Sequence, residues 1–146
     1  MQRATGFTLI EALLSVAIIA ILAGLSLPLY RSYAAQNDLS LAAQYISTSL
    51  RRAETYAQNG AQDSPWGVSV QTSQVVVYKG DSYENRDRTY DEATTLGSIT
   101  SVSGVTDVSF ARLTTEPSAT GAISITSTNN ETRTMSVNEQ GTISYE

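Results

Sequence analysis

One apolar segment limits the folds that this chain can adopt. Between Phe7 and Leu29, Glu11 is the only ionisable side chain. As an α-helix rising ~1.5 Å per residue, this segment would be about 35 Å long, and the hydrocarbon core of a bilayer is roughly 30 Å thick. We therefore expect a membrane-spanning helix over residues 7–30, and Arg3 before it favours a cytoplasmic amino terminus.

The position of Glu11 separates three interpretations of this segment. A cleaved export signal has an apolar core of about 7–15 residues, which is shorter than this run and does not contain a carboxylate. A plain membrane anchor gains nothing from Glu11, because an acidic side chain near the centre of a spanning helix costs about 2.5–3.5 kcal/mol on insertion scales. The third interpretation, in which Glu11 has a function inside an apolar environment, is favoured.

Composition excludes several classes of chemistry. The 146 residues include neither cysteine nor histidine, which removes disulfides, Cys/His zinc sites and the common catalytic triads. We expect no enzymatic activity and no cofactor. The formal net charge of −5 argues against nucleic acid as a partner, since phosphate-binding surfaces are basic.

The residues around Glu11 carry a family resemblance. Gly6-Phe7-Thr8-Leu9-Ile10-Glu11, followed by the apolar run with Pro28 near its end, resembles the amino-terminal signature of type IV pilins and pseudopilins. The resemblance implies that residues 1–6 are a leader, that a prepilin peptidase cuts after Gly6, and that Phe7 is then N-methylated. It also implies that Glu11 neutralises the amino group of a neighbouring subunit.

The same resemblance implies partners and places. Before assembly, the subunit would be inserted in the cell membrane as a single-pass protein with its amino terminus in the cytoplasm. A membrane-embedded assembly platform would then add it to a homo-oligomeric filament, or to a filament of other pilins, outside the cell or in the periplasm.

A bend is expected inside the apolar helix. Pro28 lacks an amide hydrogen and clashes with the carbonyl of Gly24, which is itself a weak helix former. We predict that the helix kinks or loosens between these two residues, although both residue types are also common in ordinary membrane helices.

The helix is predicted to continue beyond Tyr30 with a different pattern, over residues 31–60. Apolar side chains recur at steps of three or four, which is typical of one face of an amphipathic helix: Leu39, Ala42, Ala43, Ile46, Leu50, Ala53 and Ala57. Because several of these residues are alanines, the face suits close contact with a sheet rather than deep burial. Asn59-Gly60 predicts an end near Gln58.

Residues 61–146 are predicted to form a β-rich head. Short runs of β-branched and aromatic residues indicate strands at 66–70, 74–78, 94–100, 107–112, 122–127, 132–137 and 142–145. The last two runs flank Asn138–Gly141 and predict a hairpin. The expected fold is α+β, with one long amino-terminal helix packed on a mostly antiparallel head.

Within this outline, two segments resemble the H-type pseudopilins and FimT-like proteins. They are Trp66-Gly67-Val68 and the closing segment from Arg133 to Asn138. Many type IV pilins close a carboxy-terminal loop with a disulfide, which this chain cannot form because it has no cysteine.

Residues 79–92 form an acidic segment that we predict to be a loop. Its oxygen-bearing side chains make Asp81, Glu84, Asp87 and Asp91 candidate calcium ligands. The spacing matches no EF-hand, and three basic side chains offset the charge: Lys79, Arg86 and Arg88. The alternative is a solvated loop held by ion pairs, which is favoured.

The function that the sequence favours is structural, as a pilin or pseudopilin subunit of a filament. The alternative is a minor pilin that binds DNA for uptake or acts in adhesion. Only Arg51-Arg52 and the pair Arg86 and Arg88 resemble basic patches. The acidic balance of the head therefore argues against DNA capture.

Overall fold

The computed structural model describes the backbone of residues 7–145 and, apart from residues 25–29, 31, 32 and 145, their side chains. The chain forms two compact units, Met1–Ala34 and Ala35–Glu146. One helix, α1 (Leu9–Gln58), contributes to both.

The carboxy-terminal end of α1 is set by glycine, as the sequence predicted. Gly60 has a φ of +62°, in the left-handed region that glycine adopts without strain. Its N–H donates a hydrogen bond of 3.0 Å to the carbonyl of Ala57. A short 3₁₀ turn, η1 (Ala61–Asp63), then leads into the first strand.

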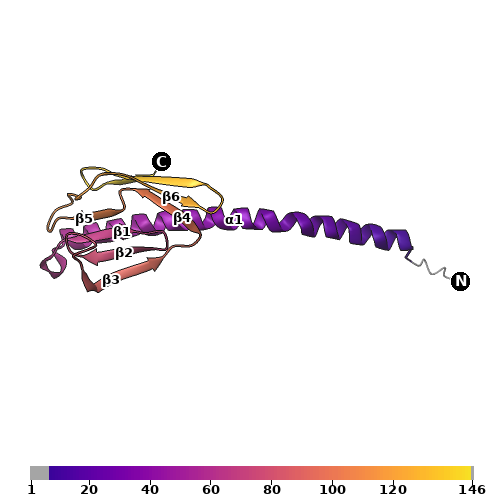
Figure 1. The fold of residues 1–146 in the computed structure, drawn as a ribbon, viewed down its shortest axis with the longest axis horizontal. Coiled ribbons are helices and arrows are strands. Elements are labelled where there is room, and N and C mark those ends of the chain that lie inside the picture. The colour runs from indigo at the N-terminus through magenta and orange to yellow at the C-terminus, as the bar shows by residue number, and fades with distance from the viewer. Residues whose placement is uncertain (1–6, 146) are drawn as a thin grey trace. The chain divides into compact units, whose positions relative to one another are not determined.

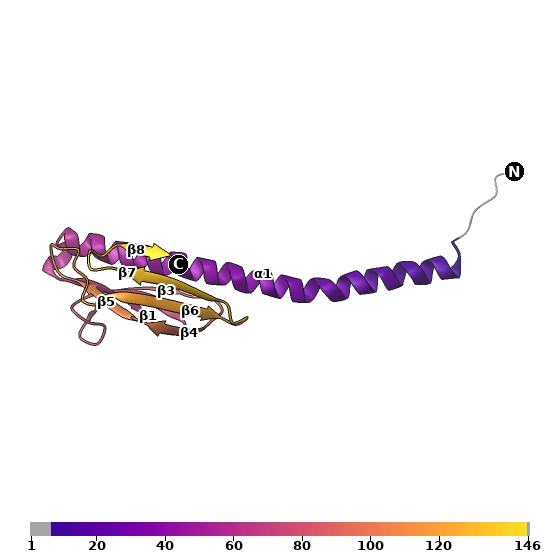
Figure 2. The same ribbon diagram turned by 90° about the horizontal axis from the view of Figure 1, so that it is seen from above.

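The rest of the second unit is two antiparallel four-stranded sheets (Figures 1 and 2). The first sheet has the order β3-β2-β1-β5 and contains β1 (Trp66–Val70), β2 (Gln74–Lys79), β3 (Asp87–Thr95) and β5 (Asp107–Phe110). The second has the order β4-β6-β7-β8 and contains β4 (Ile99–Gly104), β6 (Gly121–Ser127), β7 (Thr132–Val137) and β8 (Ile143–Tyr145). This confirms the α+β fold, and the pairing of β7 with β8 confirms the predicted hairpin.

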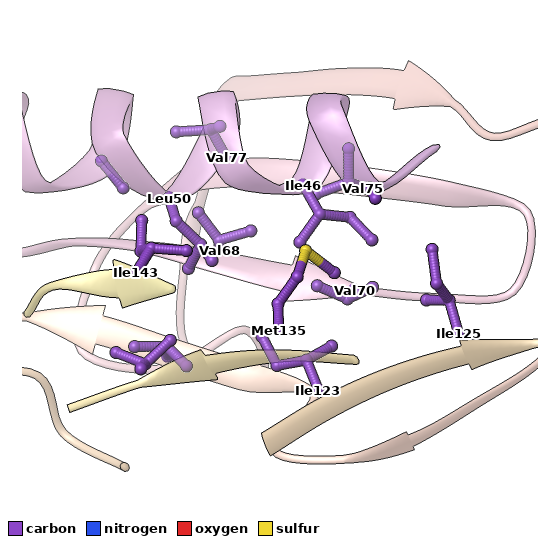
Figure 3. Packing of buried hydrophobic residues seen from close by; sticks show 14 of the residues in the cluster. Ile46, Leu50, Val68, Val70, Val75, Val77, Ile123, Ile125, Met135 and Ile143 are labelled. Atoms are coloured by element: carbon purple, nitrogen blue, oxygen red, sulfur yellow. The ribbon is translucent and has the colours of Figure 1, made fainter. Parts of the chain in front are cut away.

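The apolar face of α1 is the centre of the core. All seven residues of the predicted stripe are at most 5% exposed and belong to one cluster with side chains of both sheets. Figure 3 shows Ile46 and Leu50 of α1 among the valines of β1 and β2, with Met135 of the second sheet close by. The expectation of close contact with a sheet without deep burial was wrong about the burial, because side chains of two sheets cover this face.

Two predictions of secondary structure between residues 79 and 100, one of a strand and one of a loop, were also wrong. The predicted strand 94–100 is the end of β3 and the start of β4, separated by a turn in which Ser98 has a φ of +46°. Residues 87–92, predicted as loop, belong to β3. This strand is at the edge of its sheet, where one side faces solvent and charged side chains are tolerated.

The second unit contains a complete core, so we predict that a fragment beginning at Ser32 folds alone. It should show near-UV circular dichroism and one cooperative thermal transition. Within it, Leu50→Ala should cost about 2–5 kcal/mol, because Leu50 is fully buried. The exposed Leu41 supplies the control, whose alanine variant should unfold close to wild type. A fragment without near-UV signal would contradict the prediction.

Candidate assembly and surface sites

The amino-terminal part of α1 is apolar and uncovered. Ten large apolar side chains between Phe7 and Leu22 are 50–80% exposed. A helix that is apolar around its whole circumference requires a lipid or protein environment. These residues have no such partner within the described part of their own unit, so they form a candidate surface for contact with lipid or with other chains.

Thr8 caps the start of α1. Its hydroxyl oxygen accepts a hydrogen bond of 3.3 Å from the N–H of Glu11, and its carbonyl accepts one of 3.2 Å from the N–H of Ala12. The pattern Thr8-Leu9-Ile10-Glu11 is the sequence signal of a capping box, and it would have identified this residue in advance. The cap fixes where the helix starts and so places Glu11 in its first turn.

The Glu11 side chain is exposed at a favourable end of the helix. Its negative charge lies in the first turn, where the helix dipole stabilises anions. Ser15 donates a hydrogen bond of 2.8 Å to the backbone carbonyl of Glu11, so the Glu11 carboxylate takes no part in this hydrogen bond. Among the described residues the carboxylate forms no ion pair, so it is available to a cation from another molecule.

Other features predicted in this region stay predictions. Gly6 lies outside the described residues, as does the side chain of Pro28. The helix assignment continues through Gly24 and residue 28, which leaves the predicted kink open. Within the described residues, none of the helices combines the length and apolar character needed to cross a membrane.

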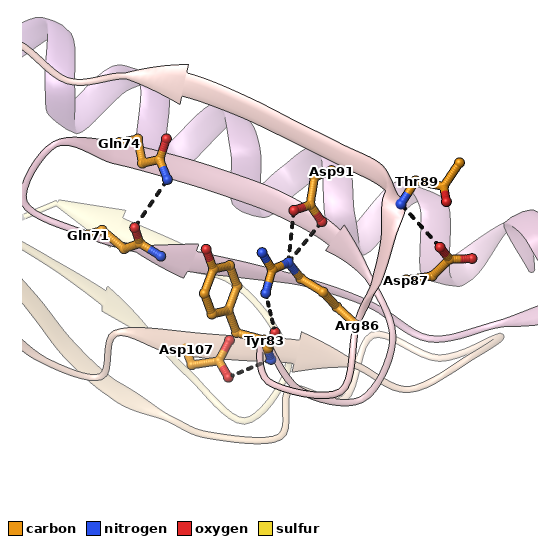
Figure 4. Close-up of polar contacts among 8 residues, drawn as sticks. All are labelled: Gln71, Gln74, Tyr83, Arg86, Asp87, Thr89, Asp91 and Asp107. Carbon is orange, nitrogen blue, oxygen red and sulfur yellow. Dashed lines mark hydrogen bonds and ion pairs between the residues drawn. The ribbon is translucent and has the colours of Figure 1, made fainter.

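The segment between β2 and β3 is held in place by two linked sets of polar contacts (Figure 4). Arg86 donates from Nε to Asp91 at 2.9 Å and from Nη1 to the Tyr83 carbonyl at 2.6 Å, and its guanidinium stacks on the Tyr83 ring. Asp107 accepts the Tyr83 N–H at 3.2 Å and the hydroxyl of buried Tyr78 at 2.6 Å. Burial, with this hydrogen bond, raises the pKa of Tyr78 far above its ordinary value.

The four calcium candidates are not brought together. Asp91 pairs with Arg86, while Asp87 lies 3.7 Å from Lys79. The N–H of Thr89 donates to Asp87, and this hydrogen bond is the main reason that the pKa of Asp87 is lowered. The described residues contain no group of three acidic side chains placed to hold a metal ion.

The two candidate basic patches are partly neutralised within the chain. Arg52 donates a hydrogen bond of 2.6 Å to Glu92, and Arg86 is paired with Asp91. Each of the two arginine pairs therefore has one member engaged by a carboxylate. This arrangement weakens both as sites for phosphate.

Comparisons with known proteins agree with the amino-terminal pattern. A family model described as "Prokaryotic N-terminal methylation motif" matches residues 1–27. Two proteins of Pseudomonas aeruginosa, each named "Fimbrial protein", are 30% identical to this chain over 109 residues. The matches cover 66% of this chain and 71% of each relative. No solved structure matches.

Removing the Tyr78 hydroxyl tests the contacts that hold the β2–β3 segment. Tyr78→Phe should cost about 1–3 kcal/mol of folding stability, because Asp107 loses a donor. Tryptic cleavage after Arg86 should become faster, and Tyr45→Phe, at an exposed tyrosine, is the matched control. The raised pKa of Tyr78 contributes stability that is complete below about pH 10, the ordinary tyrosine value.

The sign of the pH effect follows from that shift. Above this pH the unfolded wild-type chain loses its proton first, so the stability deficit of Tyr78→Phe should shrink. A variant with unchanged stability and unchanged cleavage at neutral pH would show that these contacts do not hold the segment.

Proposed function

Because the chain belongs to the type IV pilin family and is a structural subunit of a pilus filament, we propose that its amino-terminal helix serves both membrane storage and assembly. The observation that carries this proposal is the exposure of the large apolar side chains from Phe7 to Leu22 around Glu11, whose carboxylate forms no ion pair with any described residue. Lipid covers that surface in the precursor, and the helices of neighbouring copies cover it in the filament.

Processing is the first step of the proposal. A prepilin peptidase cleaves after Gly6 and the new amino group of Phe7 is methylated, which is supported by the match of residues 1–27 to a methylation motif. Cleavage removes the charged leader, including Arg3, and creates an amine next to the apolar surface. The helix then carries one positive and one negative group near its start.

Pairing between copies is the second step. A carboxylate and an amine are each costly in an apolar bundle, and they offset one another when they meet. Glu11 of one copy pairs with the Phe7 amine of the next, which sets the register between the helices. The Thr8 cap supports this function because it fixes the start of the helix, with Glu11 in the first turn and Phe7 directly before the cap.

Delivery and location complete the proposal. The precursor is anchored in the membrane, a membrane-embedded platform extracts it, and the filament extends outside the cell or into the periplasm. The likeness of Trp66–Val68 and Arg133–Asn138 to H-type pseudopilins and FimT-like proteins belongs to this proposal as well. The protein acts by assembly and carries out no catalysis.

Intact-mass spectrometry tests the processing step. We expect the fibre or membrane form to begin at Phe7 and to carry one additional methyl group. Gly6→Ala tests the cut site, since it should leave the full-length chain in the membrane. A mature chain that begins at Ala35, as cleavage of an export signal after Ser32-Tyr33-Ala34 would produce, or one that retains Met1, would show that the processing step is wrong.

Glu11→Ala tests the pairing step. The substitution makes membrane insertion easier, so a loss of assembly cannot come from a poorer anchor. An unpaired charge left in the bundle costs about 3–5 kcal/mol, so the yield of sheared fibres should fall strongly while the processed membrane pool stays constant. Glu11→Asp should be intermediate because it keeps the charge with a shorter reach.

The control for this experiment is Glu139→Ala, which removes an exposed carboxylate from the turn between β7 and β8. It should leave the fibre yield unchanged. If Glu11→Ala subunits assemble as well as Glu139→Ala subunits when each is the only source, Glu11 does not set the register.

A further inference from the structure

A basic groove lies between α1 and β7. It has a volume of about 380 Å³ and is lined by Ser40, Ala43, Gln44 and Arg133. Arg133 is exposed, and its guanidinium has no ion-pair partner in the described part of the chain. The nearby Glu131 accepts a hydrogen bond of 2.7 Å from Gln36, an amide rather than a cation.

An acidic groove lies elsewhere on the same unit. It has a volume of about 300 Å³, and Asp81 and Glu116 are the charged residues of its lining, beside the serines 109 and 118. Neither carboxylate forms an ion pair with any described residue. Arg112, which lies close in sequence to Glu116, is already paired with Asp63.

The two grooves lie at opposite ends of the second unit. Ser40 is near the start of the α1 segment that belongs to this unit. The acidic groove lies near the carboxy-terminal end of α1. Leu113, close in sequence to Glu116, donates its N–H to the carbonyl of Ala57. Gly80, next to Asp81, donates its N–H to the carbonyl of Pro65, which follows the helix and lines the groove. At ~1.5 Å per residue, about 26 Å of helix separate Ser40 from Ala57. Figures 1 and 2 show the β2–β3 segment and the β6–β7 turn at opposite ends of the sheets.

We propose that these grooves meet between successive copies of the chain, with Arg133 of one copy entering the groove of Asp81 and Glu116 on the next. The inference rests on the proposed function, since it concerns contacts within a filament. The charges are complementary, and the two surfaces differ and lie at opposite ends of one body. Such a contact is heterologous, so it repeats as an open chain rather than closing into a dimer.

Complementary charge at the contact also offsets the electrostatic repulsion between copies of this acidic chain. The chain has a net charge of −5, so neighbouring copies repel one another unless unlike charges face each other at the contact. Four of the basic side chains are already paired with carboxylates of their own chain: Arg52, Lys79, Arg86 and Arg112. Arg133 is free to contact a second copy, and its groove leaves room for the edge of that copy.

Charge exchange in the full-length chain tests this contact. Arg133→Glu should lower the yield of sheared fibres about fivefold, in line with the loss of a close charge pair at each contact. Glu116→Arg should have a similar effect, and the two substitutions in one chain should restore much of the yield. Arg88→Glu, at an exposed arginine of β3 outside both grooves, is the matched control for the change in charge.

A second readout uses the absence of cysteine from the chain. Fibres built from the variant Arg133→Cys, Glu116→Cys should give a ladder of covalent oligomers with a thiol-specific crosslinker that is longer than a disulfide. The variant Arg88→Cys, Glu116→Cys should give none.

The outcomes separate the two proposals. If Arg133→Glu assembles as well as Arg88→Glu, or if the exchanged pair recovers nothing, the groove contact is wrong while the pilin function stands. If the wild-type chain forms no fibres when it is expressed with its assembly machinery, the proposed function and this contact fail together.

Discussion

The structure depends on the burial of apolar surface, and the chain buries the apolar side chains of only part of α1. From Leu39 to Ala57 two sheets cover the apolar face of the helix and leave it at most 5% exposed. From Phe7 to Leu22 the large apolar side chains are 50–80% exposed. Each such side chain gains about 1.5–3 kcal/mol on burial, so this segment stabilises whatever assembly covers it.

In the filament that we propose, polar groups at the start of the helix give the assembly its specificity. Apolar contact alone is non-directional and sets no register between helices. A single carboxylate on an apolar surface does so, because it is costly to bury unless it meets a cation. Thr8 contributes by fixing the first turn of the helix and hence the place of Glu11. In the same proposal, the head adds a second level of specificity through unlike charges at its two ends.

Much of this structure was predictable from local sequence patterns. The apolar stripe of α1, the end of the helix at Gly60 and the β7–β8 hairpin each follow from short-range spacing and turn chemistry. Strand β3 was missed because its charges suit an edge, and edge position is a property of the sheet order. The two grooves were equally hidden, since Asp81 and Glu116 meet only through the fold. Thr8 was predictable as a cap from the glutamate three residues after it, whereas the apolar pattern predicts a function for Glu11 alone.

We propose that Glu11 holds the helices of neighbouring copies in register, and a cryo-electron microscopy reconstruction of the fibres would show the position of its carboxylate. We expect the apolar segments to pack together in the fibre, with each Glu11 carboxylate within about 3 Å of the Phe7 amine of a neighbouring copy. A fibre in which these helices face solvent, or in which Glu11 lies away from every amine, would contradict it.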